Sequence, residues 1–380
     1  MTAGQEAAKQ KIERVLRQLA HGVGDERLAS GLQTLFDDLV VFYEAYWGQD
    51  TSWAYVSQLQ GCKTEADAFV AAAHEAARRG MHPAAVTLAD FAVRTAPNNP
   101  HVSLLQARLL RKAGRTEQAR AICKGLRNSF PDLFEIDDEL FMCDVEERFW
   151  SRDYYRLLAD IHATCQPQTY LEIGVATGKS LALARSGTVV TGVDPASAEQ
   201  AALQYHSPEN VPRLYKMTSD EYFATQDFCA ETTAACLDLA FIDGLHHFDQ
   251  VLKDFANLER YAGPNTLICI HDCLPIHDRV ASRARSTGFW TGDVWKVIPC
   301  LRQVRPDLEI VTIPVQPSGL ALIRRLNPDS RVLSRQHDAL VRHFENLVLP
   351  ERWEDTLDIL AVEMDENSFR LEQFLPSGRC

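Results

Sequence analysis

Regularly spaced cysteines, long apolar runs and an excess of positive charge are all missing from this sequence. Its ten cysteines are scattered without C-x-x-C pairs, as expected for a chain that is kept reduced. No uncharged apolar run approaches the ~18 residues that a membrane-spanning helix needs, and the chain opens without a charged and then apolar leader. We therefore expect a cytoplasmic protein with no membrane span.

The shortage of positive charge disfavours nucleic acid as a partner. The chain has 39 Lys and Arg against 52 Asp and Glu, which gives a net charge of −13. A body that binds nucleic acid needs Lys and Arg in excess along one face to neutralise phosphates. In other respects the 380 residues, 46% of them hydrophobic and 24% charged, are ordinary for a soluble globular chain of about two or three domains.

The N-terminal region contains a repeat of 34 residues, which is the tetratricopeptide period. Small residues at fixed positions let two antiparallel helices pack closely, and a proline ends the second helix of each pair. Residues 66–131 therefore resemble two tetratricopeptide units, with further small residues at Ala73, Ala92 and Ala107. The recurring pairs are Gly80 with Gly114, Ala85 with Ala119, and Pro97 with Pro131.

Two repeats are fewer than the three or so units that such stacks usually need to bury a core. The flanking sequence at about 30–60 and 134–160 is helical in pattern and is expected to cap the stack. Two interpretations of this region remain open. It is either a surface for a protein partner or for self-association, or a helical extension that only packs on the rest of the chain.

A buried strand, a glycine-bearing turn, a short helix and a second strand ending on an acid are predicted for residues 169–194. Gly174 and Gly178 allow a ligand to approach the backbone closely, and Asp194 lies about 20 residues further on, where an acid can bind ribose hydroxyls. A dinucleotide fingerprint, G-x-G-x-x-G/A, would have glycine where this chain has Ala176 and glycine or alanine where it has Lys179, so a pyrophosphate site is poorly supported.

Glu172 places a carboxylate beside this turn, which suits a cationic ligand and repels a polyphosphate. The segment 170–178, Y-L-E-I-G-V-A-T-G, and the V-D-P at 193–195 resemble the first two motifs of class I S-adenosylmethionine-dependent methyltransferases. The usual middle glycine of that family is Ala176 here. The resemblance implies a set of cofactor-binding residues: Glu172, Gly174, Ala176, Gly178, Asp194, Thr218, Ser219, Asp220 and Asp243.

The expected fold class is α/β, with a seven-stranded Rossmann-like methyltransferase sheet preceded by an all-α tetratricopeptide-like domain. The last two strands are close enough to form a hairpin around residues 316–319, so the final strand should run antiparallel. We expect a helical domain at 1–148, a methyltransferase domain at 149–328 and a helical extension at 329–380. The predicted strands are 170–173, 189–193, 213–217, 237–242, 266–270, 309–315 and 319–324.

Two of these strands end in acidic and histidine residues. Asp243 and His246 follow the strand at 237–242, and His271 and Asp272 follow the strand at 266–270. Ligands of open α/β sheets bind beyond the carboxyl ends of the strands, so these groups should converge on the cofactor turn. His246 is the leading candidate for a general base because its ordinary pKa is near neutral. Capping of the following helix is the alternative role for His246, and His247 is expected to be structural.

Asp243 and Asp272 should end neighbouring strands, where two carboxylates would repel each other unless they are protonated or bridged by a hard cation such as Mg²⁺. The block is similar to metal-dependent O-methyltransferases of the catechol type, with His246 in place of their Lys base. However, Cys273 replaces an asparagine ligand, and a thiol suits Mg²⁺ poorly. The metal remains open. Without it, Asp243 would contact the methionine portion of the cofactor or orient His246.

The D-G-x-H and H-D-x-x-P pair at Asp243 and His271 also resembles a bacterial branch that methylates sugars of natural products or surface polysaccharides. After the fifth strand, the inserted segment carries His277, Trp290 and Trp295. Aromatic faces stack on sugars and planar rings, so this segment is expected to contribute to the acceptor pocket. The alternative is a helix whose tryptophans belong to the core.

These features favour an S-adenosylmethionine-dependent O-methyltransferase that acts on a hydroxyl of a small molecule or glycan, with a histidine base and an optional divalent metal. An N-methyltransferase is an alternative, because the fold does not determine the acceptor atom. A non-catalytic assembly protein with a remnant methyltransferase domain is the other, although the Asp and His cluster argues against degeneration. A nicotinamide oxidoreductase is the weakest hypothesis.

Overall fold

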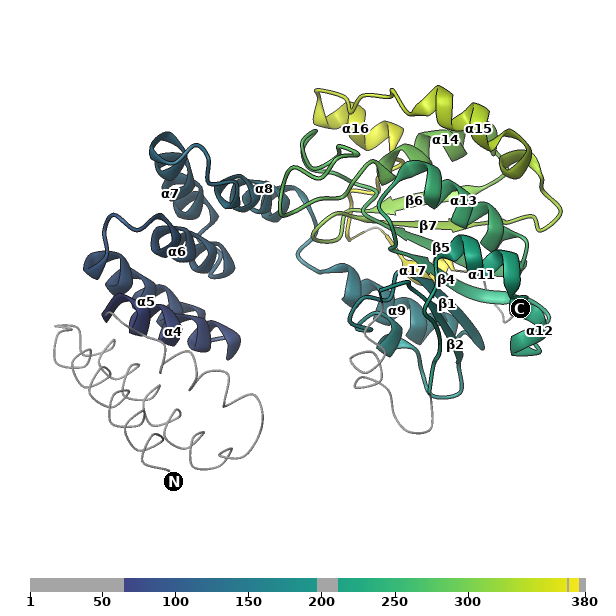
Figure 1. The fold of residues 1–380 in the computed structure, drawn as a ribbon, viewed down its shortest axis with the longest axis horizontal. Helices are drawn as coiled ribbons and strands as arrows, with labels where there is room; N and C mark the ends of the chain where they lie inside the picture. Colours follow the sequence, from purple (N-terminus) through teal and green to yellow (C-terminus); the bar gives the residue numbers. More distant parts are fainter. Residues whose placement is uncertain (1–64, 197–210, 368, 376–380) are drawn as a thin grey trace. The chain divides into compact units, whose positions relative to one another are not determined.

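The computed structural model describes residues 65–196, 211–367 and 369–375, and the chain divides into two compact units between Cys143 and Asp144 (Figure 1). The segment at 30–60 that we expected to cap the repeats lies outside the described residues. None of the described helices is long and apolar enough to cross a membrane. The three-part division at residues 148 and 328 stays a prediction.

The first unit is built from consecutive antiparallel helix pairs. Gly80 and Gly114, with φ of 75° and 76°, lie between the two helices of each pair, where glycine adopts this left-handed conformation without strain. The helices end at Thr95 and Ser129, just before Pro97 and Pro131, as the repeat predicts. The helices of this region are α4 (Glu65–Arg78), α5 (His82–Thr95), α6 (Pro100–Lys112), α7 (Thr116–Ser129) and α8 (Glu135–Arg148).

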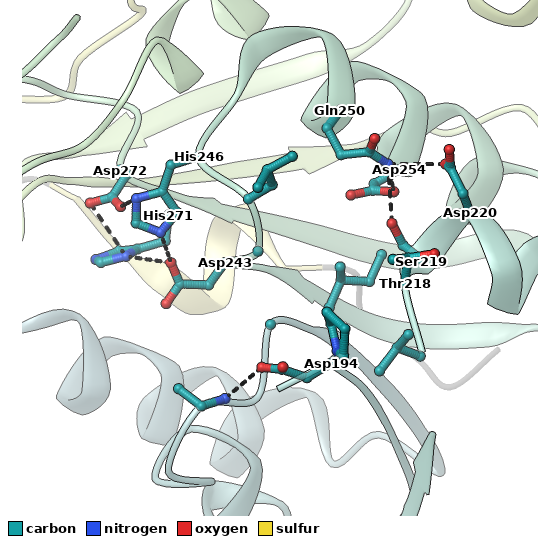
Figure 2. Close-up of a pocket in the computed structure, with 17 residues that line it drawn as sticks. Asp194, Thr218, Ser219, Asp220, Asp243, His246, Gln250, Asp254, His271 and Asp272 are labelled. Carbon is teal, nitrogen blue, oxygen red and sulfur yellow. Dashed lines mark hydrogen bonds and ion pairs between the residues drawn. The ribbon is translucent and has the colours of Figure 1, made fainter. Parts of the chain in front are cut away.

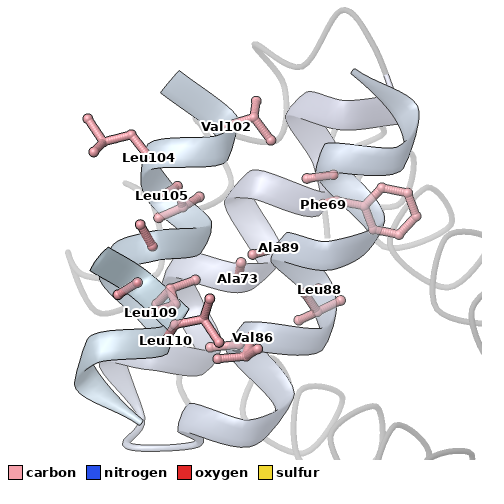
Figure 3. Packing of buried hydrophobic residues seen from close by; sticks show 14 of the residues in the cluster. Phe69, Ala73, Val86, Leu88, Ala89, Val102, Leu104, Leu105, Leu109 and Leu110 are labelled. Carbon is pink, nitrogen blue, oxygen red and sulfur yellow. The ribbon is translucent and has the colours of Figure 1, made fainter. Parts of the chain in front are cut away.

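The small residues of the repeat form the centre of the first unit's core. Each is fully buried, and larger side chains such as Leu88 and Leu105 fill the space around them (Figure 3). Since alanine lets helix axes approach closely, a bulkier residue at these positions would separate the pairs. The tetratricopeptide-like prediction for this region is therefore confirmed in its helices and in its packing. The buried small residues are Ala73, Ala85, Ala92, Ala107 and Ala119.

The second unit contains a seven-stranded sheet in the order β3-β2-β1-β4-β5-β7-β6. Strands β1 to β5 are parallel, and β7 runs antiparallel to both β5 and β6. The predicted α/β fold with an antiparallel final strand is confirmed. The strands are β1 (Thr169–Ile173), β2 (Val189–Val193), β3 (Arg213–Tyr215), β4 (Leu237–Ile242), β5 (Ala262–His271), β6 (Glu309–Ile313) and β7 (Leu320–Arg324).

The register of the central strands brings their carboxyl ends to one level. Ile173 of β1 pairs with Ile242 of β4, and Ile242 pairs with Ile270 of β5. All five residues of β1 are buried, as expected for a central parallel strand covered on both faces. The residues that follow these three strands, Gly174 and Asp243 among them, therefore lie beside one another at the same edge.

Helices cover both faces of this sheet (Figure 1). Helix α9 packs on the face that carries Tyr170 and Phe241, while α13, α14 and α15 lie together on the other side. The tail beyond residue 334 contains helices, as predicted. The helices of this unit are α9 (Tyr154–Cys165), α11 (Ser219–Thr225), α12 (Phe228–Thr232), α13 (Phe248–Glu259), α14 (Val297–Val304), α15 (Val332–Phe344), α16 (Trp353–Ile359) and α17 (Leu371–Phe374).

The short helix expected after the glycine turn is reduced to a single 3-10 turn at Leu181–Leu183. Gly178 and Gly187, both with positive φ, bound this segment and leave little length for an α-helix. The Ser180 hydroxyl also donates to the buried Glu172 carboxylate, which holds the segment against the sheet. The two glycine conformations and the contact between Ser180 and Glu172 thus explain why the expected helix is only a single turn.

Candidate active site

A cavity of about 570 Å³ opens at the carboxyl ends of β1, β2, β4 and β5, at the edge where α/β proteins bind ligands. Helices α11 and α13 complete its walls (Figure 2). Most of the residues singled out from the sequence line this cavity. Its lining consists of Ile173, Gly174, Ala176, Val193, Asp194, Pro195, Thr218, Ser219, Asp220, Asp243, Gly244, Leu245, His246, Gln250, Asp254, His271 and Asp272.

The turn after β1 is fixed by two close approaches. A Cβ atom on Gly174 would lie 2.0 Å from the Asp243 carbonyl oxygen, so only glycine fits between the tips of β1 and β4. The Asp194 carboxylate accepts hydrogen bonds from the backbone N–H groups of Val175 and Ala176, at 2.9 Å each. Its other oxygen, Oδ1, accepts from the Ala196 N–H at 2.7 Å. Asp194 therefore stands in one orientation at the cavity, with one lone pair of Oδ1 left for a ligand hydroxyl.

A second polar group lies at the end of the cavity formed by α11 and α13. Thr218 and Glu221 form a capping box that begins α11, and this cap presents Ser219 and Asp220 to the cavity. Gln250 Nε2 donates to the Ser219 hydroxyl and to a carboxylate oxygen of Asp220, at 3.1 Å each. Gln250 had no distinctive motif in the sequence, and only its position in the first turn of α13 could have indicated it.

Asp254 is a further lining residue that sequence reasoning missed. The residue is 1% exposed, and its carboxylate accepts a hydrogen bond from Gln250 Nε2 at 3.0 Å. Burial raises the pKa of Asp254 to about 6. It follows Gln250 by one helical turn on the same face of α13, which is the spacing that brings two side chains together.

Glu172 and Gly178 do not line the cavity. The Glu172 carboxylate is fully buried and accepts hydrogen bonds from the hydroxyls of Tyr170 and Ser180, both at 2.6 Å. Burial raises the pKa of Glu172 to about 8. Glu172 lies within the buried strand β1 and not at its exposed tip. It therefore stabilises the segment after the turn through Ser180 and does not contact the cavity.

The Asp and His residues after β4 and β5 form one compact cluster (Figure 2). His246 Nε2 lies 3.5 Å from Asp243 Oδ1, and His246 Nδ1 lies 2.9 Å from Asp272 Oδ2. His271 Nδ1 lies 3.1 Å from Asp243 Oδ1 and 3.5 Å from Asp272 Oδ1. Each carboxylate therefore contacts both imidazoles, and the convergence expected from the sheet is present.

The charges of this cluster shift the protonation of its members. Burial disfavours the charged form of His246, but its contacts with Asp243 and Asp272 raise its pKa to about 10. Although burial acts in the opposite direction, His271 and His246 hold the pKa of Asp243 well below its ordinary value. His246 consequently keeps its proton in this arrangement, and it can accept one only when another cation or a donor engages the carboxylates.

A backbone contact from the inserted segment holds His246 in place. His246 has a φ of 57°, and a Cβ on Gly292 would lie 1.9 Å from its carbonyl oxygen. The start of α13 is capped from a distance, because the buried Asp293 carboxylate accepts from the Phe248 N–H at 2.8 Å and His247 makes no side-chain cap. His247 occupies the N-cap position, and neither histidine caps the helix through its side chain.

The three candidate acceptor residues occupy different surroundings. The Trp290 ring stacks on His246, with centroids 5.4 Å apart and planes inclined by 19°, beside the cluster. Trp295 is 1% exposed and belongs to the core. His277 is exposed, and its Nδ1 lies 2.5 Å from Asp278 Oδ1. Only Trp290 is brought next to the candidate chemistry.

Three side chains are placed where one divalent cation could contact them all. One ligand atom each from Asp243, His246 and Asp272 lies within 4.8 Å of the others. Adjacent ligands of an octahedral Mg²⁺ at 2.0–2.1 Å lie about 3 Å apart, close to the separation of His246 from Asp272. Two carboxylates and one imidazole also suit Mn²⁺, Fe²⁺ or Zn²⁺. The donor set therefore fits a divalent cation.

Family comparison agrees with this geometry. Residues 171–273 match the family model of a methyltransferase domain, a stretch that contains both the turn after β1 and the Asp and His cluster. The second unit thus resembles class I S-adenosylmethionine-dependent methyltransferases in this matched stretch and in the order of its sheet. In the first unit, residues 76–137 match a tetratricopeptide repeat model. No curated protein matches the chain.

Solved structures of methyltransferases are similar to this chain at low identity. A putative O-methyltransferase from Klebsiella pneumoniae is 17% identical over 56% of this chain and 99% of its own, with a TM-score of 0.38. The O-methyltransferase TomG from Streptomyces achromogenes, solved with S-adenosylmethionine, is 15% identical over 46% and 79%, with a TM-score of 0.36. These likenesses are too distant to transfer an acceptor to this chain.

Proposed function

We propose that the methyltransferase unit transfers the methyl group of S-adenosylmethionine to a hydroxyl oxygen of a small molecule, with a sugar, a glycosylated metabolite or a polysaccharide as the acceptor class. One observation carries the proposal. The glycine turn after β1 and the Asp and His cluster after β4 and β5 line the same cavity. Methyl transfer to a hydroxyl needs this combination of a held donor and a nearby proton acceptor.

Methyl transfer requires that a group in the Asp and His cluster accept the proton of the acceptor hydroxyl. As the acceptor oxygen attacks, the carbon–sulfur bond breaks, its electron pair stays on sulfur, and the hydroxyl proton must leave. His246 is the better candidate to take that proton, because 25% of its side chain is exposed whereas that of His271 is 7% exposed. Both nitrogens of His271 also have partners within 3.2 Å, Asp243 and Ser318, whereas among the described residues His246 Nε2 has only a neighbour at 3.5 Å, Asp243 Oδ1.

The cavity suits a positively charged donor. Five aspartates and no lysine or arginine are among its lining residues, so a sulfonium is favoured over a phosphate-bearing ligand. Asp194 is expected to bind the ribose hydroxyls, and Thr218, Ser219 and Asp220 the adenine. Gly174 then lets the methionine portion approach the tip of β4.

Asp243 and Asp272 would hold a divalent cation, which would engage the two carboxylates and leave the His246 imidazole able to accept the hydroxyl proton. Bound there, the cation would stabilise the negative charge that develops on the acceptor oxygen. A chelator should then abolish methyl transfer and added Mg²⁺ should restore it. Full activity in chelator would remove the metal role of both aspartates.

The cofactor is tested by thermal-shift titration with S-adenosylmethionine, S-adenosylhomocysteine and NAD. We expect the first two to stabilise the protein, and stabilisation by NAD alone would contradict the proposal. Transfer of labelled methyl groups into a metabolite extract then identifies the acceptor. Substitution His246→Ala should lower turnover by about 10²- to 10⁴-fold, the usual contribution of a general base, with cofactor affinity nearly unchanged.

The first unit is proposed to bind an acidic protein partner or a second copy of the chain. Between residues 78 and 127, Lys and Arg far outnumber Asp and Glu in a chain of net charge −13. Arg108 and Lys112, one helical turn apart on α6, are exposed. Light scattering of the full chain at rising salt tests self-association, and the double reversal Arg108→Glu with Lys112→Glu should abolish any complex that depends on these charges.

A further inference from the structure

The buried imidazole of His271 is held on three sides. Its Nδ1 lies 3.1 Å from Asp243 Oδ1, and its Nε2 lies 3.2 Å from the Ser318 hydroxyl. The Tyr154 ring packs against its face, with centroids 3.9 Å apart. His271 and Ser318 are 7% and 0% exposed. A ring with a partner at each nitrogen and an aromatic face against it has little freedom to turn.

The two residues that hold His271 come from separate segments that are themselves fastened together. Ser318 lies in the connection between β6 and β7, and its carbonyl accepts from the Leu274 N–H at 2.8 Å. Tyr154 begins α9, and its N–H donates to the Gln316 carbonyl at 3.0 Å. The hairpin is therefore bonded both to the chain just after β5 and to α9, so the surroundings of His271 form a rigid frame.

The surroundings of His271 are linked to His246 through a single oxygen atom, Oδ1 of Asp243. Asp243 Oδ1 contacts His271 Nδ1 and also lies 3.5 Å from His246 Nε2. A rotation of His271 would remove the donor that fixes this oxygen and would let Asp243 move relative to His246. Misplacement of a reacting group by about 1 Å can cost on the order of 10²-fold in rate.

We propose that Ser318 and Tyr154 are positioning residues for methyl transfer: they lock His271, and His271 fixes the Asp243 carboxylate beside His246. The inference rests on the proposed function, since it assigns these groups to that reaction. Neither residue touches the cavity. Ser318 acts by partnering the outer nitrogen of His271, and Tyr154 acts by covering the face of its ring.

The test uses the full chain with Ser318→Ala, which removes the partner of Nε2, and Tyr154→Leu, which removes the aromatic face. Tyr154→Phe keeps that face, and Ser334→Ala, at an exposed position of α15, is the matched serine control. Methyl transfer is measured with labelled S-adenosylmethionine at varied concentration and a fixed metabolite extract as acceptor. The ¹⁵N resonances of the His271 ring are recorded for each variant.

We expect Ser318→Ala and Tyr154→Leu to lower the apparent kcat by about tenfold or more, with little change in KM for S-adenosylmethionine and with displaced His271 resonances. Tyr154→Phe should stay closer to the wild type than Tyr154→Leu. Wild-type kcat in Ser318→Ala, or a loss of kcat matched by an equal loss of cofactor affinity, would overturn the inference.

The resonance measurement separates this inference from the proposed function. If the wild type transfers no methyl group, the proposed function fails, and the His271 resonances still report whether Ser318 and Tyr154 hold the ring. Unchanged resonances in both Ser318→Ala and Tyr154→Leu would overturn the positioning role by themselves.

Discussion

Substitution of Gly174 by alanine tests how closely the tips of β1 and β4 approach each other. The new Cβ would lie 2.0 Å from the Asp243 carbonyl oxygen and 2.4 Å from its carbonyl carbon. Both atoms belong to the backbone, so no side chain can rotate away. Because carbon and oxygen do not approach within about 3 Å without repulsion, the two strand tips must separate by roughly 1 Å.

An alanine at Gly174 would cost both backbone strain and steric overlap. Gly187 has the same backbone conformation without the overlap, so it serves as a control for the strain alone. Gly174 and Gly187 both have a φ of 90°, where a non-glycine residue costs about 1–3 kcal/mol. Only Gly174 has atoms in the way, since a Cβ on Gly187 would meet nothing within 4 Å. Overpacking costs a further 1–3 kcal/mol or so. Gly174→Ala should therefore lower the free energy of unfolding by about 1–3 kcal/mol more than Gly187→Ala.

Urea unfolding of the two variants measures this difference directly, as a shift in midpoint at constant slope. Titration calorimetry with S-adenosylmethionine provides the functional half of the test. Because the displaced atoms belong to Asp243 and Gly244, which line the cavity, Gly174→Ala should also weaken cofactor binding, whereas Gly187→Ala should not. Equal destabilisation by both substitutions, with equal cofactor affinity, would refute the reasoning.

Three further predictions concern single residues of the second unit. Glu172→Gln should remove one part of the pH dependence of stability. The buried carboxyl has a pKa raised from 4.5 to about 8, so in urea titrations the free energy of unfolding of the wild type should fall more steeply than that of the variant as pH rises between those values; equal slopes would contradict this. Ala176→Gly should raise the thermal midpoint, because alanine at a φ of 46° costs about 1–2 kcal/mol, more than the roughly 0.5–1 kcal/mol of chain entropy that glycine adds; an unchanged or lower midpoint would contradict this. Trp290→Ala should raise KM for the acceptor while calorimetry shows unchanged cofactor affinity, and loss of cofactor binding would argue against an acceptor role.

The strands and the cofactor turn could be predicted from the sequence because their signals are local. The bounds of β4 coincide with the predicted 237–242, since an apolar run ending in Asp243 marks both its length and its tip. Parallel strands in register then bring Asp243 and Asp272 together without any further information. In the first unit, the 34-residue spacing of small residues identified the helix pairs for the same reason.

The contacts that define the cluster could not be predicted, because they join segments far apart in the chain. Ser318 meets His271 across 47 residues, and Asp293 caps Phe248 across 45. No periodicity encodes such pairs. The burial of Glu172 could not be predicted either. The sequence places its carboxylate next to the glycine turn, which suggests a ligand-binding group, and only the structure shows that its whole strand is buried.

The remote cap on α13 has a consequence for protein engineering. Asp293 and Gly292 belong to the inserted segment after β5, which we predicted to contribute to the acceptor pocket. Asp293 bonds to the first N–H of α13, and Gly292 lies against the carbonyl of His246. Exchange of this segment to alter acceptor choice would therefore also remove a support of the proposed base. A chimera designed for a new acceptor must carry over this Gly-Asp pair, or it will change substrate recognition and catalytic geometry at once.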